Sequence, residues 1–261
     1  MKRKVIYTCL FGKIDNLLQP KVIDNSFDYI CFSDYMLPQS GIWQIRQIAD
    51  SGLDVIAQSR FPKLMPHKVL EDYDYSLYID GNVQIKDKEF YVYVEQAIEQ
   101  NVLIAQVPHP TRDCIYQELE QCLNVRKVTP WQYIRHRQKY TKSGSPHHWG
   151  LYENNVILRK HNDPQVVRIS EQWWEEYNLI SNRDQLSLML VYWREQYKPQ
   201  LLLGEGQNTR TSHLIGCISH SDVSRNNNGC WWKKALLFLQ RKTLLPLYRR
   251  WVHAEEYQSE W

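Results

Sequence analysis

Short apolar runs alternate with amphipathic stretches along most of the chain. The runs are rich in β-branched and aromatic residues, as strands are, and they occupy residues 4–11, 27–32, 75–79, 102–107 and 151–159. A more exposed strand is predicted at 42–48 and a short one at 201–203. Helical spacing of apolar positions predicts helices over 89–100, 114–123, 125–142, 166–177 and 186–193. This alternation of strands and helices predicts an α/β domain.

The run 75–79 ends at a turn that carries candidate chemistry. Gly81 and Asn82 break the strand, so Asp80 lies where a buried strand meets a turn. Open α/β sheets bind ligands at this edge. Asp80 and Asn82 face the same side of an extended segment and offer oxygen ligands to Mn²⁺ or Mg²⁺, which often share such ligands with phosphates. The turn predicts a metal and nucleotide-sugar diphosphate site, with a plain hairpin turn as the alternative.

Two other segments offer polar groups beside strands. Before the Asp80 strand, four cationic or potentially cationic residues fall within nine positions: Arg60, Lys63, His67 and Lys68. Some share a helical face, which suits diphosphate binding, and a solvated basic face is the alternative. After the run 102–107, a strand-end loop and the helix behind it carry His109, Arg112, Asp113 and Glu118. Strand-end loops often bind ligands, although a helix N-cap at Thr111 or Asp113 would also explain this pattern.

The second half of the chain adds three candidates. Residues 143–150 (SGSPHHWG) form a predicted flexible segment that would serve as an acceptor loop or lid. Asn154 and Asn155 lie midway along a predicted strand, which indicates a bulge or a ligand. Asp184 and Gln185 begin a helix, where they either cap it or present a carboxylate and an amide to a substrate.

Composition narrows the function classes. The chain has 261 residues and a net charge of +3, and residues 223–254 contain seven Lys or Arg and no acid. Without these seven charges the remainder carries −4, which argues against nucleic acid as a partner of the body. Six cysteines without a C-x-x-C pair make a structural zinc site unexpected and fit a reducing cytoplasm. No signal peptide or 18-residue apolar stretch is evident, so a cytoplasmic protein is expected.

The basic charge belongs to a distinct C-terminal segment. We predict a catalytic domain over 1–224 and a helical extension over 225–261, beginning with the linker RNNNG. Basic pairs at 233/234, 241/242 and 249/250 alternate with Trp, Leu and Phe, and Pro246 should split the segment into two short amphipathic helices. This combination is typical of helices that lie on an anionic membrane surface, here peripherally on the inner face. An arm packed on the body or on a partner subunit is the alternative.

Eight separated blocks then point to a family. They are YTCLFGKIDNL, FDYICFSD, RFPKLMPHKVL, DYSLYIDGNVQI, HPTRDCIYQE, GLYENNVILRKHND, WW and RDQLS, in this order between about Tyr7 and about Trp193. Together they resemble the glycosyltransferase-like family that includes plant mucilage-related proteins. More distantly, the chain resembles retaining nucleotide-sugar transferases related to glycogenin. The segment after Gly204 has no counterpart in this resemblance.

The resemblance implies a GT-A fold, a Rossmann-like α/β domain with a mainly parallel central sheet. It implies that Asp80-Gly81-Asn82 stands in for an Asp-x-Asp metal motif, with neutral Asn82 lowering metal affinity and cations taking more of the phosphate charge. Asp184-Gln185 resembles a pair near the donor sugar, and a late histidine, His213 or His220, would be a metal ligand.

The predicted function is metal-assisted transfer of a sugar, from a UDP-sugar or similar donor to a glycan or lipid-linked acceptor. The donor-binding residues would be Tyr7, Thr8, Asp15, Arg60, Lys63, His67, Asp80, Gly81, Asn82 and Asn155. Asp184, Gln185 and Asp113 would be catalytic, and Asp80, Asn82 and His220 would hold the metal. One alternative is a metal-dependent hydrolase of a lipid or amide substrate, in which a metal with Asp80, His67, His109 and His161 activates water. The other is a nucleotide- or glycan-binding protein without turnover. Retention or inversion at the anomeric carbon is left open.

Overall fold

A seven-stranded mixed sheet forms the centre of the protein. The computed structural model describes residues 2–12, 16–37, 40–48, 52, 54–218, 238–248 and 250. The sheet order is β3-β2-β1-β4-β7-β6-β8, from β1 (Lys4–Leu10), β2 (Asp28–Ser33), β3 (Gln44–Gln47), β4 (Tyr75–Ile79), β6 (Ile104–Pro108), β7 (Tyr152–Arg159) and β8 (Gln200–Leu201). Only β7 runs antiparallel to its neighbours. The expectation of an α/β domain with a mainly parallel sheet is confirmed.

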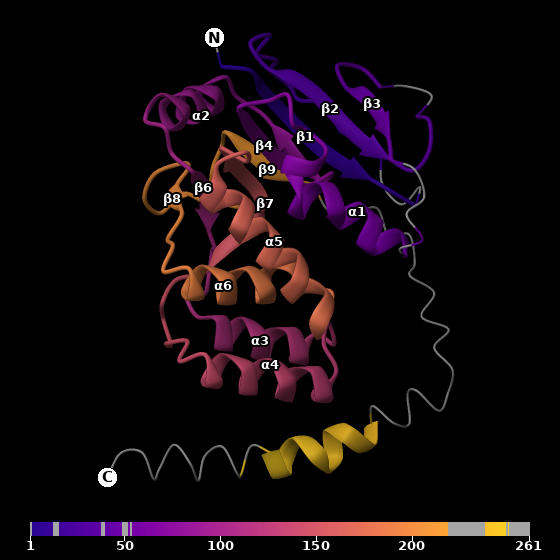
Figure 1. Ribbon diagram of the computed structural model, residues 1–261, viewed down its shortest axis with the longest axis vertical. Coiled ribbons are helices and arrows are strands. Elements are labelled where there is room, and N and C mark those ends of the chain that lie inside the picture. The colour runs from indigo at the N-terminus through magenta and orange to yellow at the C-terminus, as the bar shows by residue number, and fades with distance from the viewer. Residues whose placement is uncertain are drawn as a thin grey trace.

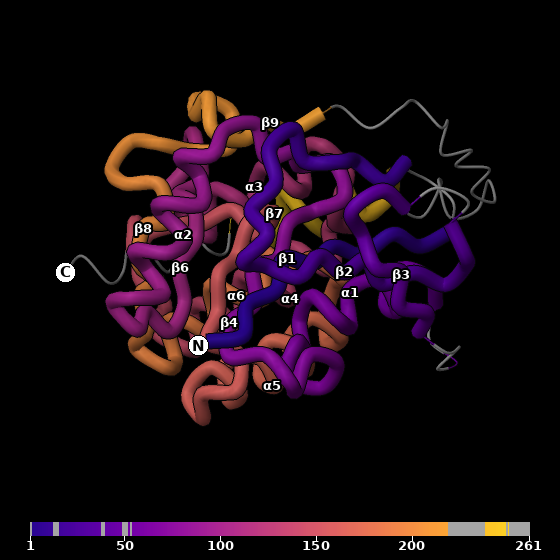
Figure 2. Tube along the Cα trace, turned by 90° about the horizontal axis from the view of Figure 1, so that it is seen from above, coloured from indigo at the N-terminus to yellow at the C-terminus, as the bar shows by residue number. Residues whose placement is uncertain are grey.

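Helices cover the sheet unequally (Figures 1 and 2). The structure describes α1 (Val55–Leu64), the short 3-10 helix η1 (Pro66–Lys68), α2 (Glu89–Glu99), α3 (Ile115–Asn124), α4 (Pro130–Lys142), α5 (Pro164–Leu179) and α6 (Asp184–Arg194). One core packs side chains of α3, α4, α5 and α6 against one face of the sheet. The other core packs α2 against the opposite face. In Figure 2, β1, β2 and β3 lie to one side and β6 and β8 to the other.

The alternation of side chains along strand β4 decides on which face of the sheet Asp80 lies. Leu77 and Ile79 point into the core beneath α2, whereas Tyr78 points into the core on the face of α5 and α6. Successive side chains alternate between faces, so Asp80 continues the face of Tyr78. The chain then turns into β5 (Val83–Ile85), which pairs with β9 (Ile215–Cys217) and not with β4. A plain β4–β5 hairpin, the alternative explanation of the Asp-Gly-Asn turn, is therefore wrong.

The two asparagines in β7 coincide with a bulge. Between Gln106 and Val107 the pairing of β6 with β7 jumps from Ile157 to Glu153. Residues 154–156 are thereby left outside this β6–β7 pairing, while β4 continues to pair with Val156. The bulge that Asn154 and Asn155 predicted is confirmed, and such irregularities often re-aim side chains beside active sites.

The described C-terminal segment, residues 238–248, is helical on either side of a turn at Thr243. Pro246 has no N–H to donate, and the helix is interrupted three positions before it, at Thr243. The two helices predicted over 231–251 lie only partly within the described residues. Leu245 is buried, and Arg241 donates to the carbonyl of Leu123 (2.7 Å) at the end of α3. This part of the arm packs on the body, while the predicted linker 225–229 lies outside the described residues. None of the helices within the described ranges is long and apolar enough to cross a bilayer.

Candidate active site

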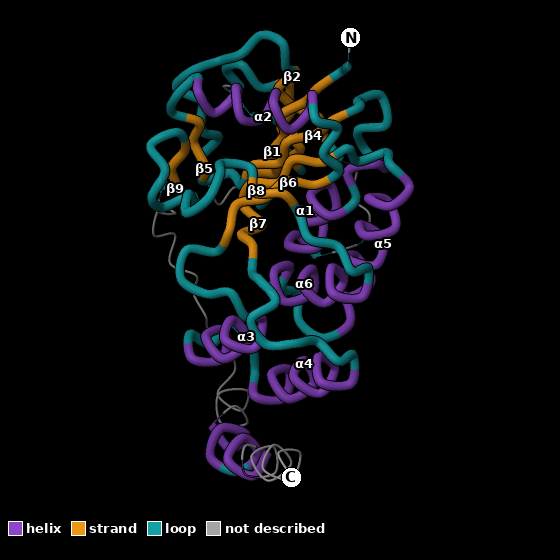
Figure 3. The backbone as a smooth tube through the Cα atoms, turned by 90° about the vertical axis from the view of Figure 1, so that its left-hand side faces the viewer, coloured by secondary structure: helices purple, strands orange, loops and turns teal. Residues whose placement is uncertain are grey.

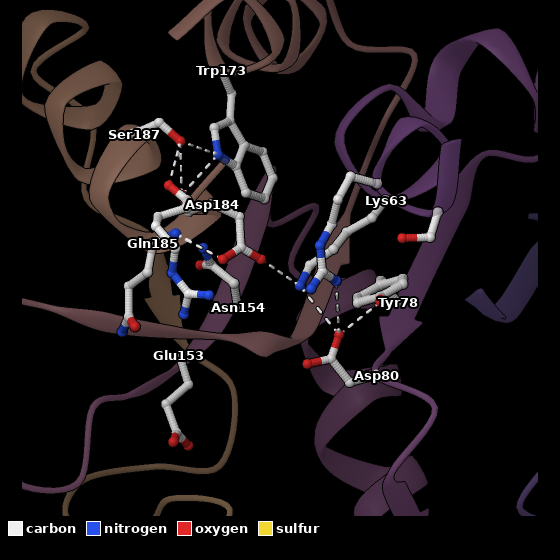
Figure 4. Close-up of polar contacts among 12 residues, drawn as sticks. Lys63, Tyr78, Asp80, Glu153, Asn154, Trp173, Asp184, Gln185 and Ser187 are labelled. Atoms are coloured by element: carbon white, nitrogen blue, oxygen red, sulfur yellow. Dashed lines mark hydrogen bonds and ion pairs between the residues drawn. The ribbon is translucent and has the colours of Figure 1, made fainter. Parts of the chain in front are cut away.

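Lys63 lies between two carboxylates that come from distant parts of the chain (Figure 4). Its Nζ is 3.1 Å from Asp80 Oδ1 and 2.7 Å from Asp184 Oδ2. Only 1% of the Lys63 side chain is exposed, so the ammonium depends on these two partners. A buried lysine without them would carry a large desolvation cost. The three residues therefore form one interdependent charged unit at the carboxyl edge of the sheet.

Helix α1 brings the cations to this unit. The Asp54 side chain caps its N-terminus by accepting from the N–H groups of Ile56 and Ala57, both at 2.9 Å. Arg60 and Lys63, three positions apart, share the helix face that is turned toward β4. Arg60 Nη1 lies 4.0 Å from Asp80 Oδ1. The prediction that these two cations gather beside Asp80 is confirmed.

Asp80 has three polar partners, and one oxygen of its carboxylate is left without a partner. The Tyr78 hydroxyl donates to Asp80 Oδ1 (2.7 Å), and the Asp80 N–H donates to the carbonyl of Asn155 (2.8 Å). Lys63 occupies the same Oδ1. No described residue forms a hydrogen bond or ion pair with Oδ2, and 30% of the side chain is exposed. One carboxylate oxygen of Asp80 is therefore available to a ligand.

Asp184 is the first residue of α6, and its backbone is fixed by a neighbouring helix. Trp173 of α5 donates from Nε1 to the Asp184 carbonyl (2.9 Å), and the Gln185 N–H donates to Asp184 Oδ1 (2.9 Å). Burial acts to raise the pKa of Asp184, but the cations of Lys63 and Arg60 outweigh it and hold this pKa well below its usual range. Asp184 is therefore an ionised hydrogen-bond acceptor and a weak proton acceptor.

Several predicted site residues lie elsewhere or remain untested. Tyr7 is wholly buried, donates to the Pro62 carbonyl and accepts from Arg159, so it is a core residue and the prediction that it binds the donor is wrong. His67 lies 3.8 Å from Glu171 of α5, and no hydrogen bond or ion pair between described residues joins it to the Asp80 cluster. His213 is largely exposed and lies 3.7 Å from Glu89 of α2, away from Asp80. Asp15 and His220 lie outside the described residues.

Asp113 also stays apart from the cluster. Its carboxylate pairs with His148 at 2.7 Å, and both side chains are mostly exposed. The N-cap of α3 is Cys114, without a side-chain hydrogen bond, so the alternative explanation of this loop as a cap at Thr111 or Asp113 is wrong.

The histidines of the hydrolase alternative are likewise structural: His161 is fully buried at the Leu70 carbonyl, and His109 packs with Arg112 and Glu118. Residues 143–150 are anchored through the carbonyls of Ser143 and Ser145, which does not support a loose lid.

The remaining predicted residues line the Asp80 turn. Thr8 is buried, and its Oγ1 has no partner among the described residues. A Cβ built on Gly81 would lie 3.9 Å from that oxygen, an ordinary contact, so space alone does not require glycine. Asn155 donates from Nδ2 to Thr209 (3.2 Å), leaving its Oδ1 buried and unpaired. Gln185 donates from Nε2 to the Tyr152 carbonyl (2.9 Å). Orphaned buried polar atoms are uncommon, and here they surround the candidate site.

Four neighbours of the site were not among the residues predicted to form it, although Asn154 was predicted to mark a bulge or a ligand. Tyr78 was assigned only to a buried strand, although its position two residues before Asp80 places both on one face. Glu153 of β7 accepts from the Thr209 hydroxyl, and burial raises its pKa. Asn154 is buried with an unpaired Nδ2 near the Asp184 end of the cluster (Figure 4). Thr209 lies in a loop, and no motif or periodicity in the surrounding sequence indicates that it belongs to the site.

The donor set suits a hard divalent cation in part. Asp80 Oδ2 is without a described partner, and Asn82 uses its Nδ2 to donate to the Ile218 carbonyl (3.2 Å), which leaves its amide oxygen available. Two oxygens match the way Mg²⁺ is often held, with phosphates and water completing the shell. No group of three or more His, Cys, Asp and Glu side chains suitable for a metal occurs within the described ranges.

The fold is an α/β domain, and the candidate site lies at the carboxyl edge of its sheet, where open sheets of this kind bind ligands. The chain belongs to the family described as TOD1/MUCI70, glycosyltransferase-like domain, whose model matches residues 36–220. That match covers more than two thirds of the 261 residues, includes Lys63, Asp80 and Asp184, and confirms the resemblance to this family. The first two sequence blocks lie before the match, and the match continues past Gly204, where the resemblance was expected to end.

Two solved structures are similar over most of the chain. The apo crystal structure of mouse xyloside xylosyltransferase 1 shares 12% identity over 75% of this chain and 83% of that chain, with a TM-score of 0.42. The apo structure of the bifunctional glycosyltransferase WbbM shares 8% identity over 77% of this chain and 38% of that chain, with a TM-score of 0.46. Comparison with curated protein sequences finds no match.

Proposed function

We propose that the protein is a GT-A type glycosyltransferase that moves a sugar from a nucleotide-diphosphate donor, most simply a UDP-sugar, to a glycan or lipid-linked acceptor. Membership of a glycosyltransferase-like family supports the reaction class. The observation that carries the proposal is the unit of Lys63, Asp80 and Asp184, with Arg60 beside it. Two cations and two carboxylates at a sheet edge suit a ligand that presents both phosphates and hydroxyl groups.

The two ends of the unit have different tasks. Breaking the bond between the anomeric carbon and the diphosphate leaves negative charge on the phosphate oxygens, and preorganised cations lower that barrier. Arg60 and Lys63 lie where they would face this charge. Ionised Asp184 would accept hydrogen bonds from sugar hydroxyls and orient the ring, and Gln185 would support it. Because its pKa is depressed, Asp184 is poorly suited to take the acceptor proton.

A divalent cation, Mn²⁺ or Mg²⁺, belongs to this proposal. When bound, it would supply electrophilic stabilisation of the diphosphate. Asp80 and Asn82 would hold it, and His220 is the candidate third ligand. The neighbourhood of Ile218 supports that choice over His213, because Ile218 exchanges two hydrogen bonds with Asn82 and lies two positions before His220 in the sequence.

Calorimetric titration of UDP with and without Mn²⁺ tests the proposal. We expect Mn²⁺ to tighten UDP binding at least about tenfold, and Asp80→Ala to abolish this dependence on Mn²⁺. Asp72→Ala is the matched control, since Asp72 is an exposed carboxylate in the turn before β4. UDP binding that is equally strong in Asp80→Ala, or absent from the wild type, would contradict the proposal. A screen of nucleotide-sugar hydrolysis would then identify the donor.

The setting proposed for this reaction is the cytoplasm, with the protein resting peripherally on the inner face of a membrane where a surface or lipid-linked glycan is assembled. The basic, aromatic composition of the C-terminal segment supports a membrane contact. A truncation that stops near Ser224, compared with the full chain in liposome sedimentation, tests it. Equal sedimentation of the two proteins would reject this part of the proposal.

A further inference from the structure

Two acid-free basic segments, far apart in sequence, meet at one end of the molecule. Residues 121–152 contain six Lys or Arg and no Asp or Glu, and residues 238–250 also lack an acid. The C-terminal segment crosses the end of the α3–α4 pair. Arg241 donates to the Leu123 carbonyl at the C-terminus of α3, and the ring of Tyr248 meets Tyr133 in the first turn of α4, edge to face, with centroids 6.5 Å apart.

Large apolar side chains remain exposed beside these charges. Trp131 on α4 is 53% exposed, and Val125 in the α3–α4 connection is 49% exposed. On the C-terminal segment, Leu245 is buried against the body while Phe238 and Leu247 are each 64% exposed. Arg126, Lys127 and Arg135 are exposed on the body and Lys242 and Arg250 on the C-terminal segment. We call this combined surface, formed by residues 124–135, 238–248 and 250, the basic end.

The opposite end of the molecule carries charges of both signs. Helix α2 lies at the far end from α4 and residues 238–248 in two perpendicular views (Figures 1 and 3). A groove beside α2 is lined by acids and by Lys88, and Lys4 pairs with Glu95; the acids are Asp24, Asp87, Glu89, Glu95 and Glu99. An anionic surface would therefore attract the acid-free basic end more strongly than the α2 end, which favours one orientation as well as a contact.

We propose that the basic end, body and arm together, is the surface on which the protein docks to an anionic bilayer. This inference rests on the membrane contact proposed for the C-terminal segment and extends it to α4 and the α3–α4 connection. Lys and Arg near the surface are attracted by acidic head groups, while Trp, Phe and Leu enter the interfacial region. A nucleic acid would match the positive charge, but it offers no apolar phase for Leu247 and Val125, so the bilayer is the partner that fits both features.

Vesicle binding by a variant of the body alone tests the proposal. The variant is Arg126→Glu, Lys127→Glu and Trp131→Ala in the full chain. The matched control is Lys86→Glu, Lys88→Glu and Val92→Ala, which makes the same change of charge and removes one exposed apolar side chain near α2. Sedimentation with phosphatidylcholine vesicles, with and without phosphatidylserine, is the readout. Thermal unfolding and UDP binding verify that each variant is folded with an intact donor site.

We expect the wild type to bind only the vesicles that contain phosphatidylserine. The body variant should bind them at least about tenfold more weakly, and the control should bind like the wild type or better. If the truncated chain loses binding while the body variant keeps it, the extension to the body is wrong although the membrane contact of the arm stands. Failure of the wild type to bind, or tighter binding to a DNA duplex than to the vesicles, would overturn both.

Discussion

Two strand ends in this protein carry similar polar residues and use them differently. At the end of β4, the unit joins residues from α1, β4 and α6, and Lys63 and Asp184 are 121 positions apart. At the end of β6, Arg112 donates from Nε to Glu118 (2.8 Å), and His109 accepts at Nδ1 from the Arg112 N–H (3.1 Å), all within ten residues. Both groups looked like candidate binding sites in the sequence.

The difference lies in what each group leaves open. The β6 group satisfies its own charges: Arg112 and Glu118 form a close pair, and burial together with Arg112 lowers the pKa of His109 to about 4, so that it stays neutral. The β4 unit holds its charges in place but leaves an oxygen of Asp80 exposed. A polar strand end therefore becomes a candidate site when distant elements converge on it and its hydrogen-bonding capacity is not exhausted.

The largest expected effect comes from removing the cation of the β4 unit. Lys63→Met leaves two carboxylates without their shared partner, and we expect a loss of about 3–5 kcal/mol in the free energy of unfolding, together with loss of UDP binding. Urea denaturation and calorimetry measure the two effects. Lys68→Met is the control, because Lys68 is half exposed and should cost less than about 1 kcal/mol. If the Lys63→Met protein were as stable as the control, the claim that the β4 unit depends on the Lys63 charge would be wrong.

Lowering the pH should reduce the stability of the fold before it protonates Asp184 in the candidate site. Burial lowers the pKa of His136 to about 4, so between pH 6.5 and 4 the unfolded chain binds a proton that the folded protein does not. Stability therefore falls as the pH decreases through this window, by on the order of 2–3 kcal/mol for His136. The slope of unfolding free energy against pH should become shallower in His136→Gln. His148→Gln, at an exposed position, should leave it unchanged.

A smaller effect is expected at the β6 group. Glu118→Gln weakens the pair with Arg112 and should cost about 1–3 kcal/mol of stability, because the charge-assisted hydrogen bonds of a mostly buried carboxylate are lost. UDP affinity should remain that of the wild type, since the group does not touch the β4 unit. A parallel loss of UDP binding at unchanged stability would show that the two strand ends belong to one site.

The smallest effect is expected at Asp113. Its pair with His148 is solvent-exposed, so Asp113→Ala should change stability by less than about 1 kcal/mol and leave UDP binding intact. This result would agree with the structure against the sequence-based prediction that Asp113 is catalytic. Loss of transfer activity with normal UDP binding would instead restore Asp113 as a group that acts on the acceptor.

Local patterns predicted much of the fold and the centre of the site. The strand 75–79 and the helix 89–100 were predicted almost to the residue, because burial periodicity and turn residues act locally. Asp80, Lys63 and Asp184 were each identified, the first by a strand end, the second by a cationic helix face and the third by a helix start. His67 was wrongly grouped with them because Pro66 redirects the chain after α1, and η1 lies beyond that helix.

The sequence by itself determined the succession of strands and helices, the family, and which residues carry charge. Only the tertiary structure decided that Lys63 bridges Asp80 and Asp184, that β5 pairs with β9, and that the two acid-free basic segments share one end of the molecule. The physical reason is range: propensity and periodicity act over a few residues, whereas ion pairing and strand pairing depend on where the packed core places elements that are many positions apart.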